Sequence, residues 1–173
     1  MKKVTKLLFA TVFLIILTGA AYGDTWTLAN SNGGDGYVVW TATGFQLWGA
    51  DNAVGPNYTT YTFTAGGAES LSIPWAYSTL DCCGSYWDPA GYVLNGVYTQ
   101  LSTNCNVQFT CDTSGTLNIA LNAGDNFGFY VYSLDSIQGR AAIDVTTPEP
   151  ATMALFGSGL LGLAGAIRRK LSR

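Results

Sequence analysis

Between residues 24 and 147, apolar and polar side chains alternate in short runs that are separated by Gly, Asn, Asp and Pro. A two-residue period of this kind is typical of β-strands, and no helical period in this segment extends beyond two turns. Asn95-Gly96, which stands between two such runs, is a strong signal for a hairpin turn. The expected strands are 25–28, 37–43, 45–48, 58–64, 69–77, 92–94, 97–101, 107–109, 116–121, 127–132 and 141–145.

Short strands at regular spacing, without an internal repeat or a linker, predict one all-β domain over residues 24–147. We expect a β-sandwich of jelly-roll or related topology. Residues 80–90 form the longest irregular segment and carry Trp87. Most aromatic side chains in such a domain pack in the core, but an aromatic ring in a loop can stack on a sugar. Trp87 is therefore a candidate glycan contact.

The N-terminus has the pattern of a secretory signal peptide over residues 1–23. Three lysines within the first six residues precede the apolar run 7–17, which is too short to span a bilayer. Ala21 and Gly23 supply the small residues that signal peptidase requires at positions −3 and −1, so we expect cleavage before residue 24. Cleavage after Ala21 and an uncleaved anchor helix are the alternatives.

The C-terminus, residues 148–173, has three successive parts. Pro148-Glu149-Pro150 comes first, an uncharged apolar segment follows at 151–167, and Arg168-Arg169-Lys170 opens a basic tail at 168–173. Seventeen helical residues span about 25 Å, close to the thickness of a bilayer core. The basic residues would keep this end in the cytoplasm, which places the β-domain outside the inner membrane.

This tripartite tail resembles the PEP-CTERM sorting signal of Gram-negative bacteria. In that family an exosortase, a membrane cysteine peptidase, recognises the tail and cleaves near the motif, and the bacteria typically make exopolysaccharide. The resemblance implies an inner-membrane intermediate and then release to the cell surface or the medium. The alternative is a plain membrane anchor in which Pro148-Glu149-Pro150 is a rigid linker.

Charge and composition exclude several classes of function. Residues 24–147 contain one basic residue, Arg140, and ten acidic ones, which gives a net charge of −9 and excludes nucleic acid as a partner. The chain has no histidine, which excludes a Ser-His-Asp or Cys-His nucleophile and a His-ligated metal. Glu69 is the only Glu before the sorting motif. We expect a protein without enzymatic activity; the alternative is a glycan-acting hydrolase that uses loop carboxylates.

Four cysteines, Cys82, Cys83, Cys105 and Cys111, lie in the exported part. An oxidising compartment favours two disulfides, and three pairings are possible. Pairing Cys82 with Cys83 strains the backbone, so we favour pairing between the two loops. A Cys₄ zinc site is the alternative.

Acidic and aromatic residues recur in two segments, 75–96 and 129–140. These segments resemble parts of CUB-type β-sandwich modules, which would make the ectodomain jelly-roll or CUB-like. In calcium-binding CUB domains the corresponding acids meet at one end of the sandwich, which implies calcium bound by Asp81, Asp88 and Asp135. The alternative is that these aspartates cap turns, which is also our interpretation of the polar loop 51–57.

The sequence therefore predicts an exported protein of the cell envelope or the exopolysaccharide matrix, with a structural, adhesive or glycan-binding role. The implied partners are signal peptidase, exosortase, the inner membrane before processing, and exopolysaccharide. Calcium is the implied cofactor.

Overall fold

The computed structural model describes residues 25–105 and 111–147. This part consists of strands joined by turns and loops, and it contains no helix that is long and apolar enough to cross a membrane. The predicted strand 107–109, the signal peptide and the sorting tail lie outside the described residues. The strands are β1 (Thr27–Asn30), β2 (Tyr37–Trp40), β3 (Gly44–Trp48), β4 (Asn57–Thr64), β5 (Glu69–Thr79), β6 (Ala90–Leu94), β7 (Val97–Gln100), β8 (Thr113–Leu121), β9 (Asn126–Ser133) and β10 (Ala141–Thr146).

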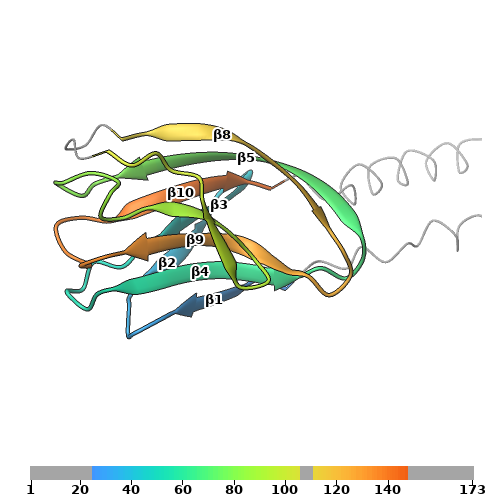
Figure 1. Ribbon diagram of the computed structural model, residues 1–173, viewed down its shortest axis with the longest axis horizontal. Helices are drawn as coiled ribbons and strands as arrows, with labels where there is room; N and C mark the ends of the chain where they lie inside the picture. The colour runs from blue at the N-terminus through green and yellow to red at the C-terminus, as the bar shows by residue number, and fades with distance from the viewer. Residues whose placement is uncertain (1–24, 106–110, 148–173) are drawn as a thin grey trace, which may run out of the picture. The chain divides into compact units, whose positions relative to one another are not determined.

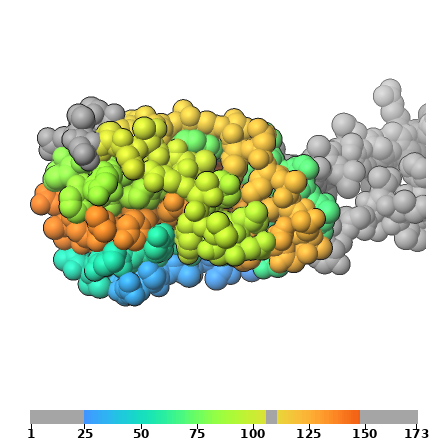
Figure 2. Space-filling model, in the orientation of Figure 1, coloured from blue at the N-terminus to red at the C-terminus, as the bar shows by residue number. Residues whose placement is uncertain are grey.

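The strands form two five-stranded antiparallel sheets, shown in Figure 1. The first sheet has the order β1-β4-β9-β6-β7, and the second has the order β2-β3-β10-β5-β8. Strands β3 to β10 have the strand order of an eight-stranded jelly roll, and β1 and β2 each extend one edge. The β6–β7 hairpin, yellow-green in Figures 1 and 2, lies on the surface at the edge of the first sheet. The all-β sandwich prediction is confirmed.

The core lies between the two sheets. Because side chains alternate along a strand, every second residue of β9 points inward, and Phe127, Phe129 and Val131 have no exposed surface. Leu47 and Ile143 face them from the second sheet and are equally buried. Complete burial of one such side chain contributes about 1.5–3 kcal/mol. The core therefore fixes which face of each strand remains for function.

Asn95-Gly96 forms the β6–β7 turn that the sequence predicts. Asn95 has φ 51° and Gly96 has φ 80°, so both central residues are left-handed, as in a type I′ turn. The side-chain oxygen of Asn95 also accepts a hydrogen bond from the N–H of Asn126 at 2.9 Å. This contact joins the turn to the start of β9.

The cysteines pair differently from our expectation. Cys105 and Cys111 form a disulfide with their Cα atoms 6.0 Å apart, whereas Cys82 and Cys83 are free thiols. The prediction of pairing between the two loops is wrong, because the disulfide closes within the connection between β7 and β8. It also leaves too few thiols for a Cys₄ zinc site. The loop that contains Cys82 contacts the β9–β10 loop instead, because the N–H of Cys82 donates to the carbonyl of Gln138 at 3.3 Å.

Candidate metal centre

Three loops meet at one end of the sandwich because the strand register brings their ends together. Ser133, the last residue of β9, lies opposite Asn57, the first residue of β4. Ala141, the first residue of β10, lies opposite Thr79, the last residue of β5. The loops that meet are 49–56, 80–89 and 134–140. They contain all three predicted calcium ligands and also Asp51.

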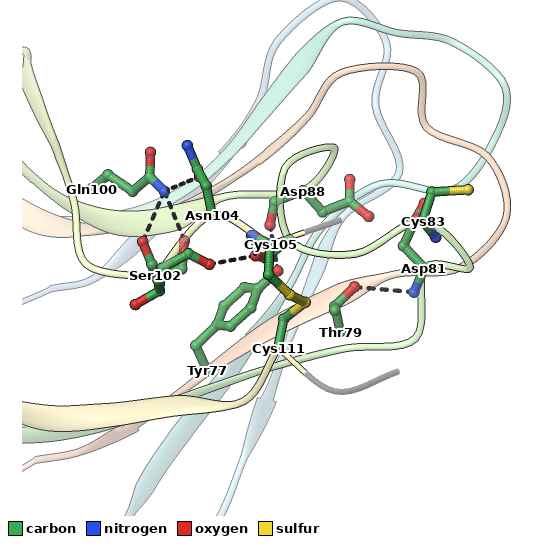
Figure 3. The surroundings of a disulfide bond; sticks show 12 residues. Tyr77, Thr79, Asp81, Cys83, Asp88, Gln100, Ser102, Asn104, Cys105 and Cys111 are labelled. Carbon is green, nitrogen blue, oxygen red and sulfur yellow. Dashed lines mark hydrogen bonds between the residues drawn. A yellow bond between two sulfur atoms is a disulfide. The ribbon is translucent and has the colours of Figure 1, made fainter. Parts of the chain in front are cut away.

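Asp88 is the most unusual residue at this end. Its side chain is 1% exposed, and neither carboxylate oxygen has a hydrogen-bond partner. The backbone is fixed, because the hydroxyl of Tyr77 donates to the carbonyl of Asp88 at 2.8 Å. In Figure 3 the carboxylate points towards Asp81 and Cys83. A buried carboxylate without a partner is costly, so this group requires a proton or a cation.

The electrostatic surroundings of Asp88 raise its pKa from 3.8 to about 7. Burial is the main cause, and the nearby carboxylates of Asp81, Asp135 and Asp51 add to it. The hydroxyl of Ser133 opposes the rise only in part, since it donates to the carbonyl of Ala50 at 3.1 Å. The negative charges of these three carboxylates, which disfavour a charged Asp88, also favour a cation in this region.

Asp81 is equally buried, at 1% exposure. Its Oδ1 accepts a hydrogen bond from the N–H of Cys83 at 2.5 Å, and its own N–H donates to Oγ1 of Thr79 at 3.0 Å. Burial raises the pKa of Asp81, and the charges of Asp135 and Asp51 contribute to the rise. These two bonds fix the main chain and the carboxylate of Asp81, whose negative charge disfavours ionisation of Asp88.

Asp135 and Asp51 complete the acidic group. Oδ1 of Asp135 accepts a bond from the N–H of Ile137 at 3.3 Å, and Oδ1 of Asp51 accepts one from the N–H of Gly139 at 3.4 Å. Asp51 was expected to cap a turn, and in the structure its charge also raises the pKa values of Asp81 and Asp88. Its position soon after β3 was the available signal, because β3 and β10 are neighbours in a jelly roll.

Carboxylates are the ligand type that a hard divalent cation prefers, but among the described residues no three of these four carboxylates have ligand atoms within 4.8 Å of one another, so calcium binding by Asp81, Asp88 and Asp135 stays a prediction. Calcium takes six to eight oxygen ligands, and carboxylates on neighbouring loops supply them. The buried, unpartnered oxygens of Asp88 are the observation that favours an ion here. The group of possible ligand atoms that does lie within 4.8 Å, among the described residues, consists of the carboxylate of Asp81 and the thiols of Cys82 and Cys83. Thiols select softer metals than calcium, so that second set would compete only for a metal such as zinc.

Trp87 lies beside this group in the β5–β6 loop. Its ring is half-buried and contacts Tyr86 edge-on at 5.7 Å, and Tyr86 is 51% exposed. The main chain is held on both sides, since the N–H of Trp87 donates to Gly84 and its carbonyl accepts from Leu134 at 2.9 Å. A glycan contact by Trp87 stays a prediction.

The fold and this acidic end define a jelly-roll domain with a candidate cation site. Comparison with known families adds the second part of the identification: residues 146–170 match the PEP-CTERM protein-sorting motif. The match confirms the sorting motif predicted at 148–150 and supports an exported protein that an exosortase processes. No curated protein sequence matches the chain.

Several solved structures are distantly similar. A family 35 carbohydrate-binding module from an environmental isolate covers 75% of this chain and 91% of its own, with 17% identity and a TM-score of 0.42. A family 35 module from Clostridium thermocellum covers 69% and 97%, with 12% identity and a TM-score of 0.38. The pre-peptidase C-terminal domain of a Bacillus anthracis collagenase covers 71% and 89%, with 18% identity and a TM-score of 0.30. The CUB-like resemblance is not confirmed and stays a prediction.

Proposed function

We propose that this chain is an exported protein of the cell envelope or exopolysaccharide matrix of a Gram-negative bacterium. Its jelly-roll domain, residues 24–147, is stabilised by calcium and binds glycan without catalysing a reaction. The tail, residues 148–173, holds the protein in the inner membrane as an intermediate until an exosortase removes the tail. The match of residues 146–170 to the sorting motif is the observation that carries this proposal.

Replacement of Pro148-Glu149-Pro150 by three alanines tests the sorting step. An exosortase that reads the motif would no longer release the domain, so we expect a full-length species in the inner membrane, about 3 kDa heavier than the processed form. This mass corresponds to the loss of residues 148–173. Membrane fractionation and mass spectrometry measure both properties. The control carries Thr152→Ala and Ser158→Ala, which change the same tail outside the motif, and it should be processed normally.

The outcome for the triple-alanine variant separates two roles of the tail. If the variant fractionates and migrates like the parent, no peptidase reads the motif: the segment 151–167 is then a plain anchor, or another peptidase removes it, and the exosortase proposal fails. The N-terminal boundary has its own test. Bulky residues at Ala21 and Gly23 should slow cleavage by signal peptidase, and mass spectrometry of the exported protein should find its N-terminus at residue 24.

Burial favours a metal-binding role over hydrolysis for the acidic group. A carboxyl group with a pKa near 7 can act as a general acid, which is the property a glycosidase requires. Asp88 and Asp81 are each 1% exposed, however, so a glycosidic bond cannot reach their oxygens in this conformation. A cation is small enough to be enclosed by both. This difference supports calcium binding as the role of the group.

A further inference from the structure

The outer face of the first sheet, which points away from the core, is rich in tyrosine and threonine. Directly opposed residues of antiparallel strands project from the same side, so the register defines this face. It contains Tyr58, Thr60 and Thr62 of β4, Tyr130 and Tyr132 of β9, and Tyr98 of β7. The other positions that the register places here are Gly, Ala, Val, Thr, Asn or Gln, and none is charged.

Four tyrosine rings form one connected cluster, which we call the tyrosine face. The ring of Tyr58 lies 4.6 Å from that of Tyr98 and 4.5 Å from that of Tyr132, and the rings of Tyr98 and Tyr130 are 5.1 Å apart. Tyr130 is 5% exposed and Tyr98 is 44% exposed. The cluster therefore has a buried base and an open edge.

The rings of Tyr58 and Tyr98 must lean over the sheet. Their strands, β4 and β7, are separated by β9 and β6, which places the backbones about 14 Å apart at the usual strand spacing. Side chains that stood upright could not bring the ring centres to 4.6 Å. Gly91 and Gly128 occupy this same face on the intervening strands, and neither adds a side chain to it. The result is an aromatic surface that lies along the sheet.

The phenolic hydroxyls of this face are free to bind a ligand. Within the described part of the chain, the Tyr77 hydroxyl has a protein acceptor, whereas those of Tyr58, Tyr98, Tyr130 and Tyr132 have none. Burial and the neighbouring tyrosines raise the pKa of Tyr130 to about 12. The hydroxyls therefore stay protonated at neutral pH, and each can both donate and accept.

We propose that the tyrosine face binds a neutral polysaccharide chain, whose sugar rings stack on the tyrosines and whose hydroxyls bond to the phenols. A pyranose has apolar C–H faces and a rim of hydroxyls, and tyrosine offers the matching apolar ring and polar tip. This inference rests on the glycan-binding role proposed above. It assigns that role to the sheet face, at a different place from Trp87.

Charge selects a neutral glycan among the polymers that stack on aromatic rings. Single-stranded nucleic acid also stacks on aromatic rings, but it needs a basic groove, and this face has no cation. The net charge of −9 over residues 24–147 repels acidic polymers such as polyuronates. A neutral hexose polymer does not need a basic groove and is not repelled by the negative charge of the domain.

Affinity electrophoresis and calorimetry on the full-length protein in detergent test the proposal. The probes are two neutral polysaccharides, hydroxyethylcellulose and galactomannan, and one acidic polysaccharide, polygalacturonate. We expect the protein to bind at least one neutral probe and not the acidic one. Tyr98→Ala should weaken that binding at least tenfold, and Tyr98→Phe, which keeps the ring, should weaken it only a few-fold. Melting temperatures show whether each variant is folded.

Tyr37→Ala is the matched control, because Tyr37 lies on the other sheet with a similar exposure of 41%. It should bind like the parent. If Trp87→Ala abolishes binding and Tyr98→Ala does not, the glycan binds at the loop, and the tyrosine face is refuted while the proposed function stands. If the parent binds neither neutral probe, both the glycan-binding role and the tyrosine face are refuted, and the sorting proposal is tested separately by the triple-alanine variant.

Discussion

The acidic end and the tyrosine face are both candidate ligand sites, but the first consists of charged side chains and the second of neutral ones. At the acidic end, Asp81 and Asp88 are buried, and the carboxylate oxygens of Asp88 have no hydrogen-bond partner. On the tyrosine face, neutral side chains are packed against each other and their polar tips reach solvent. The first arrangement is destabilising until a cation neutralises it, whereas the second stabilises the sheet with or without a ligand. Changes of pH and metal should therefore act on one region only.

The largest effect should come from the charge on Asp88 in metal-free protein. Because the pKa of Asp88 is raised to about 7, the folded state holds a proton that the unfolded state releases near pH 4. The contribution of Asp88 to stability is therefore largest below pH 4 and is lost as the pH rises to and through 7, by up to about 4 kcal/mol, most of it above pH 5. Denaturant melts in EDTA at pH 5 and pH 8 measure this fall.

Asp88→Asn isolates this contribution from the other carboxylates. The amide cannot ionise, so in EDTA at pH 8 we expect this variant to be more stable than the parent, and its stability should change less between pH 5 and pH 8. Equal pH dependence in both proteins would show that Asp88 is already neutralised by a contact within the chain.

Calcium should stabilise the parent and leave the stability of Asp88→Asn unchanged. An ion that binds only the folded state stabilises it by about 2.7 kcal/mol at a hundredfold excess over Kd, which corresponds to a rise in melting temperature of about 10 °C. We expect this rise in the parent and not in Asp88→Asn. Melting temperatures of both proteins in millimolar calcium and in EDTA measure this difference. If the parent melts at the same temperature in both, the proposed calcium binding is refuted.

Tyr98→Ala should have a smaller and constant cost. The residue is 44% exposed and contacts the rings of Tyr58 and Tyr130, so we expect a loss of about 1–2 kcal/mol. The loss should be the same in calcium and EDTA and at pH 5 and pH 8, because independent sites add. A loss that depends on calcium would show that the two regions are coupled.

The smallest effect concerns the free thiols beside Asp81. A hydrogen bond with Cys83, together with burial, raises the pKa of Cys82 to about 11, and Cys83 is exposed. Iodoacetamide at pH 8 should therefore modify Cys83 before Cys82, since the thiolate is the reactive form. Peptide mass spectrometry gives the order. Cys83→Ser should change the rate at Cys82, because serine alters this hydrogen bond.

Local patterns in the sequence were sufficient for the class of fold, for most of the individual strands and for the sorting motif. The alternation along 69–77 and the Asn95-Gly96 turn depend only on neighbouring residues, and both appear in the structure. The sorting motif at 148–150 could likewise be recognised because its three parts are contiguous in the chain. In each case the signal and the feature occupy the same segment.

The disulfide, the fourth carboxylate and the tyrosine face depended on the tertiary structure. Asp51 and Asp88 are 37 positions apart, and Tyr58 and Tyr98 are separated by 40. The loops of Asp51 and Asp88 lie at one end of the sandwich because β10 pairs with both β3 and β5, and the two tyrosines share a face because β4 and β7 belong to one sheet. Local propensities are similar for many strand orders, so the burial of the whole core selects one of them. That selection decided which aspartates repel one another and which tyrosines share a face.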